Sequence, residues 1–165
     1  KKIDHHNFMN KIPMTALGYH ELQDELKKLV NESRPNIIEA IAEARSHGDL
    51  SENAEYHSAK ESQSFIEGKI TEIESSIALA EIIDVSSLSG NEIKFGATID
   101  IIDEKTKIKS VYQIVGEYES DIEKKKLSIN SPLARGLIGK SKEDVVEINS
   151  PKGIKTYTIL AVKFI

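Results

Sequence analysis

The chain of 165 residues is long enough for one ordinary domain or two small ones. Its 39% hydrophobic and 30% charged residues are typical of a folded protein with much solvated surface. It has no cysteine, which excludes disulfides and thiolate zinc sites and favours the reducing cytoplasm. Apolar runs such as residues 77–80 are broken by charge too early to span a membrane.

Charge is divided unevenly between the two halves. Residues 1–84 carry 9 Lys and Arg against 16 Asp and Glu, a net charge of −7, whereas residues 85–165 carry a net charge of +2. An acidic half repels phosphate backbones at long range, which argues against general nucleic-acid binding by the first half. A contact with a polyanion there would need a local basic spot.

Residues 1–11 are mixed polar and include the pair His5-His6 ahead of Met9. We interpret them as an N-terminal extension or a remnant of protein production and assign them no function. Residues 1–13 lack the apolar core of a secretory signal.

Residues 12–84 are predicted to form two long helices paired as an antiparallel coiled-coil hairpin. A four-then-three spacing runs through both helices, as in a coiled-coil seam. The seam positions are Leu22, Leu26, Leu29, Ile37, Ile41 and Ala44 in the first helix, and Ala59, Gln63, Ile66, Ile70, Ile73, Ile77 and Ala80 in the second. Each helix would be about 45 Å long. The link at residues 46–52 is so short that only an antiparallel return is possible.

Pro35 lies in an eight-residue step between Leu29 and Ile37, one residue more than a heptad. Proline cannot donate the helical hydrogen bond and crowds the preceding turn, so we expect a kink or phase shift there.

Residues 85–91 form a linker by composition, and residues 92–165 are predicted to form a second domain. Its β-like runs, rich in Val, Ile, Thr and Tyr, are 97–102, 110–115, 144–148 and 156–164. A short helix is expected at 131–137, capped by Ser131 with Pro132 at its first position. The fold class is therefore α+β: a long helical hairpin followed by a small antiparallel sheet with one short helix.

The turn at residues 48–53 carries Asp49 and Glu52, two carboxylates three residues apart. One interpretation is a capping box, in which Asp49 accepts the Glu52 backbone N–H and Glu52 reaches back. The other is metal binding, because carboxylate oxygens bind Mg²⁺. Two carboxylates leave most of the octahedron to water, so the turn would be half of a site completed by a partner.

Residues 43–57 read EARSHGDLSENAEYH, which resembles the tip signature of the bacterial Gre transcript-cleavage factors. The resemblance continues, in the same order, through IPMT at 12–15, Arg34-Pro35, FGAT at 95–98 and INSPLARGLIGK at 129–140. It covers nearly the whole chain after residue 11. The small basic spot and acidic hairpin resemble the GreA branch of the family more than the GreB branch, which remains the alternative.

The resemblance implies that residues 92–165 have an FKBP-like fold and dock at the rim of the RNA polymerase secondary channel, while the hairpin enters that channel. Separately, we expect the protein to be a monomer. Asp49 and Glu52 would then share a Mg²⁺ with the polymerase active site and stimulate endonucleolytic cleavage of backtracked RNA. Asp49 would bind the metal, and Glu52 would orient or deprotonate the attacking water. No cofactor would be held stably by the chain alone, and the chain would not itself be an enzyme.

Other site residues follow from the same resemblance. Arg45 and Lys60 match basic positions that contact the RNA 3′ end, although salt bridges to neighbouring glutamates are an equally good interpretation. Ser131, Pro132 and Arg135 are candidates for polymerase docking, and the leucines of that helix are expected to pack on the sheet. His47 and His57 flank the turn as solvent-facing side chains, because nothing else completes a tetrahedral metal site.

Two other classes of function stay open from the residues alone. One is a stand-alone metal-dependent hydrolase or prolyl isomerase, although aromatics at 5% are too few to predict an aromatic-lined cleft. The other is an adaptor that occupies the polymerase channel without catalytic groups, against which Asp49 and Glu52 argue.

Overall fold

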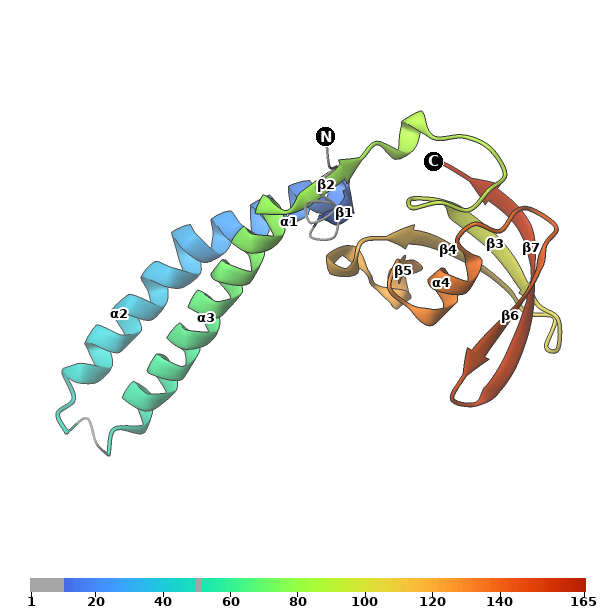
Figure 1. The fold of residues 1–165 in the computed structure, drawn as a ribbon. Coiled ribbons are helices and arrows are strands. Elements are labelled where there is room, and N and C mark those ends of the chain that lie inside the picture. The colour runs from blue at the N-terminus through green and yellow to red at the C-terminus, as the bar shows by residue number, and fades with distance from the viewer. Residues whose placement is uncertain (1–10, 50–51) are drawn as a thin grey trace, which may run out of the picture. The chain divides into compact units, whose positions relative to one another are not determined.

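The computed structural model describes residues 11–49 and 52–165 (Figure 1). Their contacts divide them into two compact units. One is a helical hairpin, Tyr19–Ala80, and the other is a sheet unit made of Glu81–Ile165 and the described residues up to Gly18. Residues 12–18, which the sequence placed with the hairpin, thus belong by their contacts to the sheet unit. The expected extension at 1–11 lies outside the described residues except for Lys11.

The first arm of the hairpin consists of α1 (Ala16–Lys28), a π-helical turn η1 (Leu29–Ser33) and α2 (Arg34–Arg45). The backbone N–H of Arg34 donates to the carbonyl of Leu29, five residues back. This wider turn comes directly before Pro35, which lies in the first turn of α2. The phase shift expected at Pro35 is therefore confirmed, and it takes the form of one π turn rather than a break.

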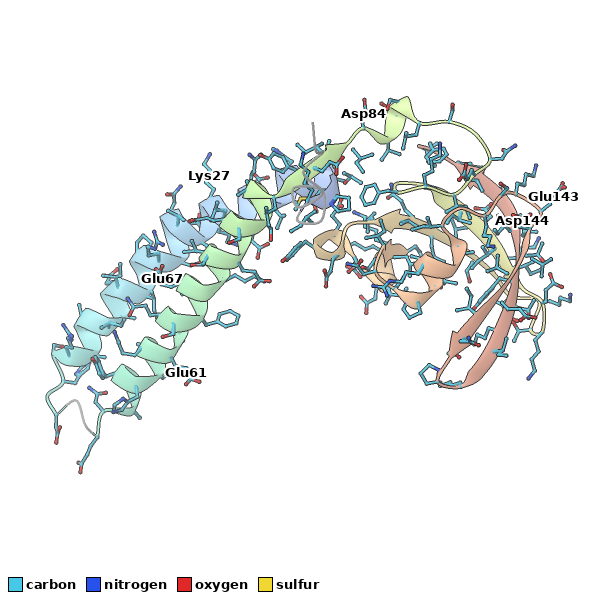
Figure 2. All side chains as sticks on the ribbon, viewed as in Figure 1. Lys27, Glu61, Glu67, Asp84, Glu143 and Asp144 are labelled. Carbon is cyan, nitrogen blue, oxygen red and sulfur yellow. The ribbon has the colours of Figure 1, made fainter. Side chains whose placement is uncertain are left out.

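The second arm is α3 (Ala54–Ala78), which is 25 residues long and spans about 37 Å. It runs antiparallel beside α2 (Figure 1). The predicted seam is confirmed, since Leu22, Ile41, Ala44, Ala59, Ile70 and Ile73 are buried. The remaining apolar seam positions are half-buried, and charged side chains such as those of Lys27 and Glu61 point away from the hairpin (Figure 2).

An ion pair between Arg34 and Glu67 joins the two arms midway along the hairpin. Arg34 Nε donates to Glu67 Oε1 at 2.7 Å, and a terminal guanidinium nitrogen donates to Oε2 at 2.9 Å. The hydrogen bond to Arg34 lowers the pKa of the Glu67 carboxyl below its ordinary value and raises the pKa of Arg34. This fork-to-fork pair adds one directional polar contact between the two arms.

The sheet unit contains five strands in the order β5-β4-β3-β7-β6. They are β3 (Thr98–Asp103), β4 (Lys109–Val115), β5 (Lys126–Ser128), β6 (Val145–Ser150) and β7 (Gly153–Lys163). Four of them match the predicted β runs. The fifth, β5, was not predicted, and it pairs with β4 in parallel. The sheet is therefore mixed, with three antiparallel pairs and one parallel pair, rather than purely antiparallel.

The short helix α4 (Pro132–Leu137) covers the buried face of this sheet. Ser131 is its N-cap as predicted, because Ser131 Oγ accepts the backbone N–H of Ala134 at 3.2 Å. Leu137 is fully buried and Leu133 packs against the same core, as expected for the leucines of this helix. The core is mostly aliphatic, with Ile93, Ala97, Ile99, Ile101, Ile114, Leu127, Val146, Ile148, Ile159 and Val162.

Two further short strands, β1 (Ile12–Thr15) and β2 (Ala80–Ile83), pair with each other. Thr15 ends β1, and its Oγ1 accepts the backbone N–H of Gly18 at 3.1 Å, which caps the start of α1. Glu119 accepts hydrogen bonds from the backbone N–H and the hydroxyl of Thr15 and from the backbone N–H of Gly116. The Glu119 carboxylate thus ties β1 to the segment between β4 and β5.

The predicted linker contains a 3₁₀ turn, η2 (Val85–Ser87), which is capped by the side chain of Asp84. Two more 3₁₀ turns, η3 (Glu117–Glu119) and η4 (Ile122–Lys124), precede β5. Among the described residues, no helix carries an apolar stretch long enough to cross a bilayer.

Candidate functional site

The turn between α2 and α3 begins with the unwinding of α2 after Arg45. The backbone N–H groups of Ser46 and His47 still donate to Glu43 and Ala44 at 3.0 and 3.2 Å. Gly48 then adopts φ +108°, a conformation that side-chain-bearing residues rarely reach. This glycine ends the helical path, so that Asp49 follows outside the helix. Leu50 and Ser51 lie outside the described residues.

Helix α3 is capped by Asn53 and not by Asp49. Asn53 Oδ1 accepts the backbone N–H of Tyr56 at 3.1 Å, and the helix begins at Ala54. The capping-box interpretation of Asp49 and Glu52 is therefore wrong. Both carboxylates precede the helix, and the acidic residue in its first turn is Glu55, where the helix dipole favours negative charge.

Asp49 and Glu52 are both exposed and line the same open hollow at the end of the hairpin. The hollow has a volume of about 430 Å³ and is also lined by His47, Asn53, Ala54 and Glu55. The turn thus brings together the two carboxylates that the sequence singled out. Carboxylate oxygens gathered at an open surface can complete the coordination of a hard cation held elsewhere.

Within residues 11–49 and 52–165, no group of three or more His, Cys, Asp or Glu side chains could hold a metal ion. Asp49 and Glu52 fit a Mg²⁺ ion only as a partial ligand set, because Mg²⁺ requires six oxygen ligands. The donor set therefore suits a metal that is shared with another molecule. His47 lines the hollow, whereas His57 packs edge-on against the ring of Tyr56 at 5.6 Å.

The two basic candidates lie close to the turn. The Arg45 guanidinium lies over the ring of Tyr56, 5.8 Å from its centroid, in a cation–π contact. Lys60 Nζ donates to Gln63 Oε1 at 3.1 Å, one turn further along α3. Within the described residues, neither side chain forms an ion pair with a neighbouring glutamate, so the salt-bridge interpretation finds no support.

Ser131, Pro132 and Arg135 lie together on α4 and its cap, in the sheet unit. Pro132 and Arg135 are exposed, while Ser131 is half-buried and its hydroxyl is occupied by the cap and by the carbonyl of Ser128. The helix thus presents Pro132 and Arg135 outward, while its leucines face the core.

The structural roles of Asn53 and Tyr56 were not predicted from the sequence. Asn53 contacts both arms, since its Nδ2 donates to the carbonyl of Ala44 at 2.7 Å. Asn is a favoured N-cap residue and stands directly before Ala54, a signal that could have placed the start of the helix correctly. The contact of Tyr56 with Arg45 crosses from one helix to the other, and no local pattern reports it.

The fold and the turn define a class: a protein with a helical hairpin that ends in exposed carboxylates and a separate small sheet unit. Two family models match the chain. "Transcription elongation factor, N-terminal" matches residues 12–82, and "Transcription elongation factor, GreA/GreB, C-term" matches residues 88–164. The chain belongs to the GreA/GreB transcription elongation factor family.

Curated relatives place it with the GreA type. It is 57% identical over 157 residues to transcription elongation factor GreA of Phenylobacterium zucineum, covering 95% of this chain and 100% of that protein. It is 60% identical over 156 residues to GreA of Beijerinckia indica, covering 94% and 99%. Among solved structures, GreA factor homolog 1 of Thermus thermophilus is 23% identical, with a TM-score of 0.43 and coverage of 93% and 99%.

Proposed function

We propose that the protein is an accessory factor that acts with RNA polymerase and stimulates the polymerase's own endonucleolytic cleavage of backtracked RNA. Cleavage leaves a new RNA 3′ end from which elongation resumes. Membership of the GreA/GreB family, at 57–60% identity to GreA relatives along their length, supports the role in elongation. RNA polymerase acts in the cytoplasm, so we place this factor there. We also expect it to work as a monomer.

The observation that carries the proposal is the pair of exposed carboxylates in one hollow at the turn of the hairpin. In phosphodiester hydrolysis by two metal ions, one ion generates hydroxide and the other stabilises the leaving oxygen. Asp49 would supply an oxygen ligand to the ion that the polymerase holds less tightly. Glu52 orients the attacking water or accepts its proton.

The hairpin geometry suits delivery of these groups through a narrow passage. A pair of helices is narrow compared with its length, since α3 alone spans about 37 Å. We infer that the hairpin enters the secondary channel of the polymerase. The exposed Pro132 and Arg135, with Ser131, belong to the surface that docks at the channel rim.

Arg45 and Lys60 supply positive charge near the acidic turn. Both are exposed, and a guanidinium or ammonium group binds the phosphate oxygens of RNA well. We assign them to the 3′ segment of the extruded transcript. An RNA contact at this spot would hold the backtracked strand while the carboxylates act beside it.

The proposal is tested with a purified, arrested elongation complex. Wild-type protein should accelerate release of the RNA 3′ fragment, whereas Asp49→Ala and Glu52→Ala should each lose about 10²-fold or more of that acceleration. Both side chains are exposed, so both variants should fold normally and still bind polymerase. Glu61→Ala removes an exposed carboxylate of α3 outside the hollow and is the matched control (Figure 2).

Wild-type cleavage rates from both alanine variants would refute carboxylate donation and leave a factor that only occupies the channel. RNA cleavage by the protein without polymerase would instead identify a stand-alone hydrolase.

A further inference from the structure

Asn53 lies between the acidic turn and α3 and forms hydrogen bonds to both helices. Its Oδ1 accepts the backbone N–H of Tyr56 at 3.1 Å and so caps α3. Its Nδ2 donates to the carbonyl of Ala44, next to the end of α2, at 2.7 Å. One half-buried side chain thus ties the start of one helix to the end of the other.

The carbonyl of Ala44 is where both ends of the turn meet. It accepts the backbone N–H of His47 at 3.2 Å as well as the amide of Asn53. His47, which follows α2, and Asn53, which precedes α3, are therefore hydrogen-bonded to the same oxygen atom. Asp49 lies two residues after the first of these groups, and Glu52 directly precedes the second.

We propose that Asn53 is a positioning residue that holds Asp49 and Glu52 in a single geometry for binding a shared metal ion. This inference rests on the proposed function. Carboxylates without a fixed position would have to be ordered each time they bind, and hydrogen bonds that hold the flanking residues His47 and Asn53 lower that cost.

The chemistry of the side chain explains why asparagine stands at this position. Serine and aspartate cap helices about as well as asparagine does, so capping alone does not select it. An aspartate carboxylate cannot donate to the Ala44 carbonyl, and a serine hydroxyl ends one bond too early to reach as far as Nδ2. An amide side chain both accepts from Tyr56 and donates to Ala44.

The first test measures, without any cleavage reaction, how firmly the two helices are held together beside the turn. The chain has no cysteine, so spin labels can be placed by Glu43→Cys and Ser58→Cys, exposed positions on the two helices beside the turn. In Asn53→Ser, which keeps the cap, the distribution of label distances should broaden. Asn53→Asp, which keeps the acceptor and lacks the donor, should broaden it as well. Glu67→Gln breaks the ion pair midway along the hairpin and should leave the distribution narrow.

The second test measures metal demand in the arrested elongation complex. Asn53→Ser should need several-fold more Mg²⁺ for half-maximal cleavage, at unchanged affinity for polymerase, while Glu67→Gln behaves as wild type. A narrow label distribution and an unchanged Mg²⁺ requirement in Asn53→Ser would overturn the inference. The proposed function is judged separately, since it fails only if Asp49→Ala and Glu52→Ala keep wild-type cleavage.

Discussion

At the scale of single residues, Gly48 stands out in the turn that follows α2 because of its backbone conformation. Its φ of +108° lies in a region that L-residues reach only with strain. A Cβ added at this position would meet no described atom within 4 Å. The cost of a side chain here therefore comes from the backbone conformation and not from crowding.

Replacing Gly48 by alanine should therefore destabilise the protein by about 1–2 kcal/mol through backbone strain alone. Denaturant unfolding of Gly48→Ala measures this cost. Gly68→Ala is the control, because Gly68 lies inside α3, where alanine is the better helix former. A Gly48→Ala variant as stable as wild type would show that the turn tolerates another path.

The acidic turn shows what the sequence can and cannot predict about single residues. The sequence singled out Asp49 and Glu52, and the structure brings them to one exposed hollow. It did not place the cap, because Asp49 and Asn53 are both good N-cap residues and lie close together in the chain. The choice depends on the Ala44 carbonyl, nine residues before Asn53 and on the other helix. Such a contact leaves no local pattern.

At the scale of elements, periodicity predicted the hairpin well because both helices keep one seam over many turns. The proline predicted where the seam would shift, although not that a π turn would absorb the shift. The strand β5 was not predicted because it has only three residues and begins at the last of three consecutive lysines. It pairs with β4 and places Leu127 in the core, and three residues are too few to show an alternating pattern in the sequence.

The ion pair between the two arms makes the hairpin sensitive to acid. Because the pKa of Glu67 is lowered in the folded state, its contribution is fully present above the ordinary glutamate pKa. That contribution is lost as the pH falls through the lowered value. The stability difference between wild type and Glu67→Gln should thus be constant near neutral pH, and it should shrink as the pH falls below the ordinary glutamate pKa and through the lowered value. Thermal melts across this range check it, and a difference that persists in acid would contradict the assignment.

The anchor of β1 makes a second prediction at this scale. Thr15→Val keeps the shape of the side chain but removes its hydroxyl. That hydroxyl accepts the backbone N–H of Gly18 at the start of α1 and donates to Glu119. The variant should lose about 1–2 kcal/mol of stability. Thr71→Val is the control, since the Thr71 hydroxyl is exposed and bonds only within its own helix. Equal stability of the two variants in denaturant would show that Thr15 does not anchor the strand.

At the scale of the whole molecule, the described residues form two compact units, and the candidate site residues are distributed over both. The hairpin carries the acidic turn and the basic spot, and the sheet unit carries α4 with Pro132 and Arg135. The resemblance of the sequence to the Gre factors predicted this organisation because its matching segments fall in both units. The role of each residue in the polymerase stays a proposal, because it depends on groups that another protein supplies.

Donation of carboxylates to a shared metal is tested by the Mg²⁺ dependence of RNA cleavage at saturating factor. Asp49→Asn keeps the size of the side chain and removes its charge. We expect this variant to bind polymerase as tightly as wild type and to need much more Mg²⁺ for the same cleavage rate. If wild type and Asp49→Asn instead show the same Mg²⁺ dependence and the same maximal rate, Asp49 does not bind the catalytic metal.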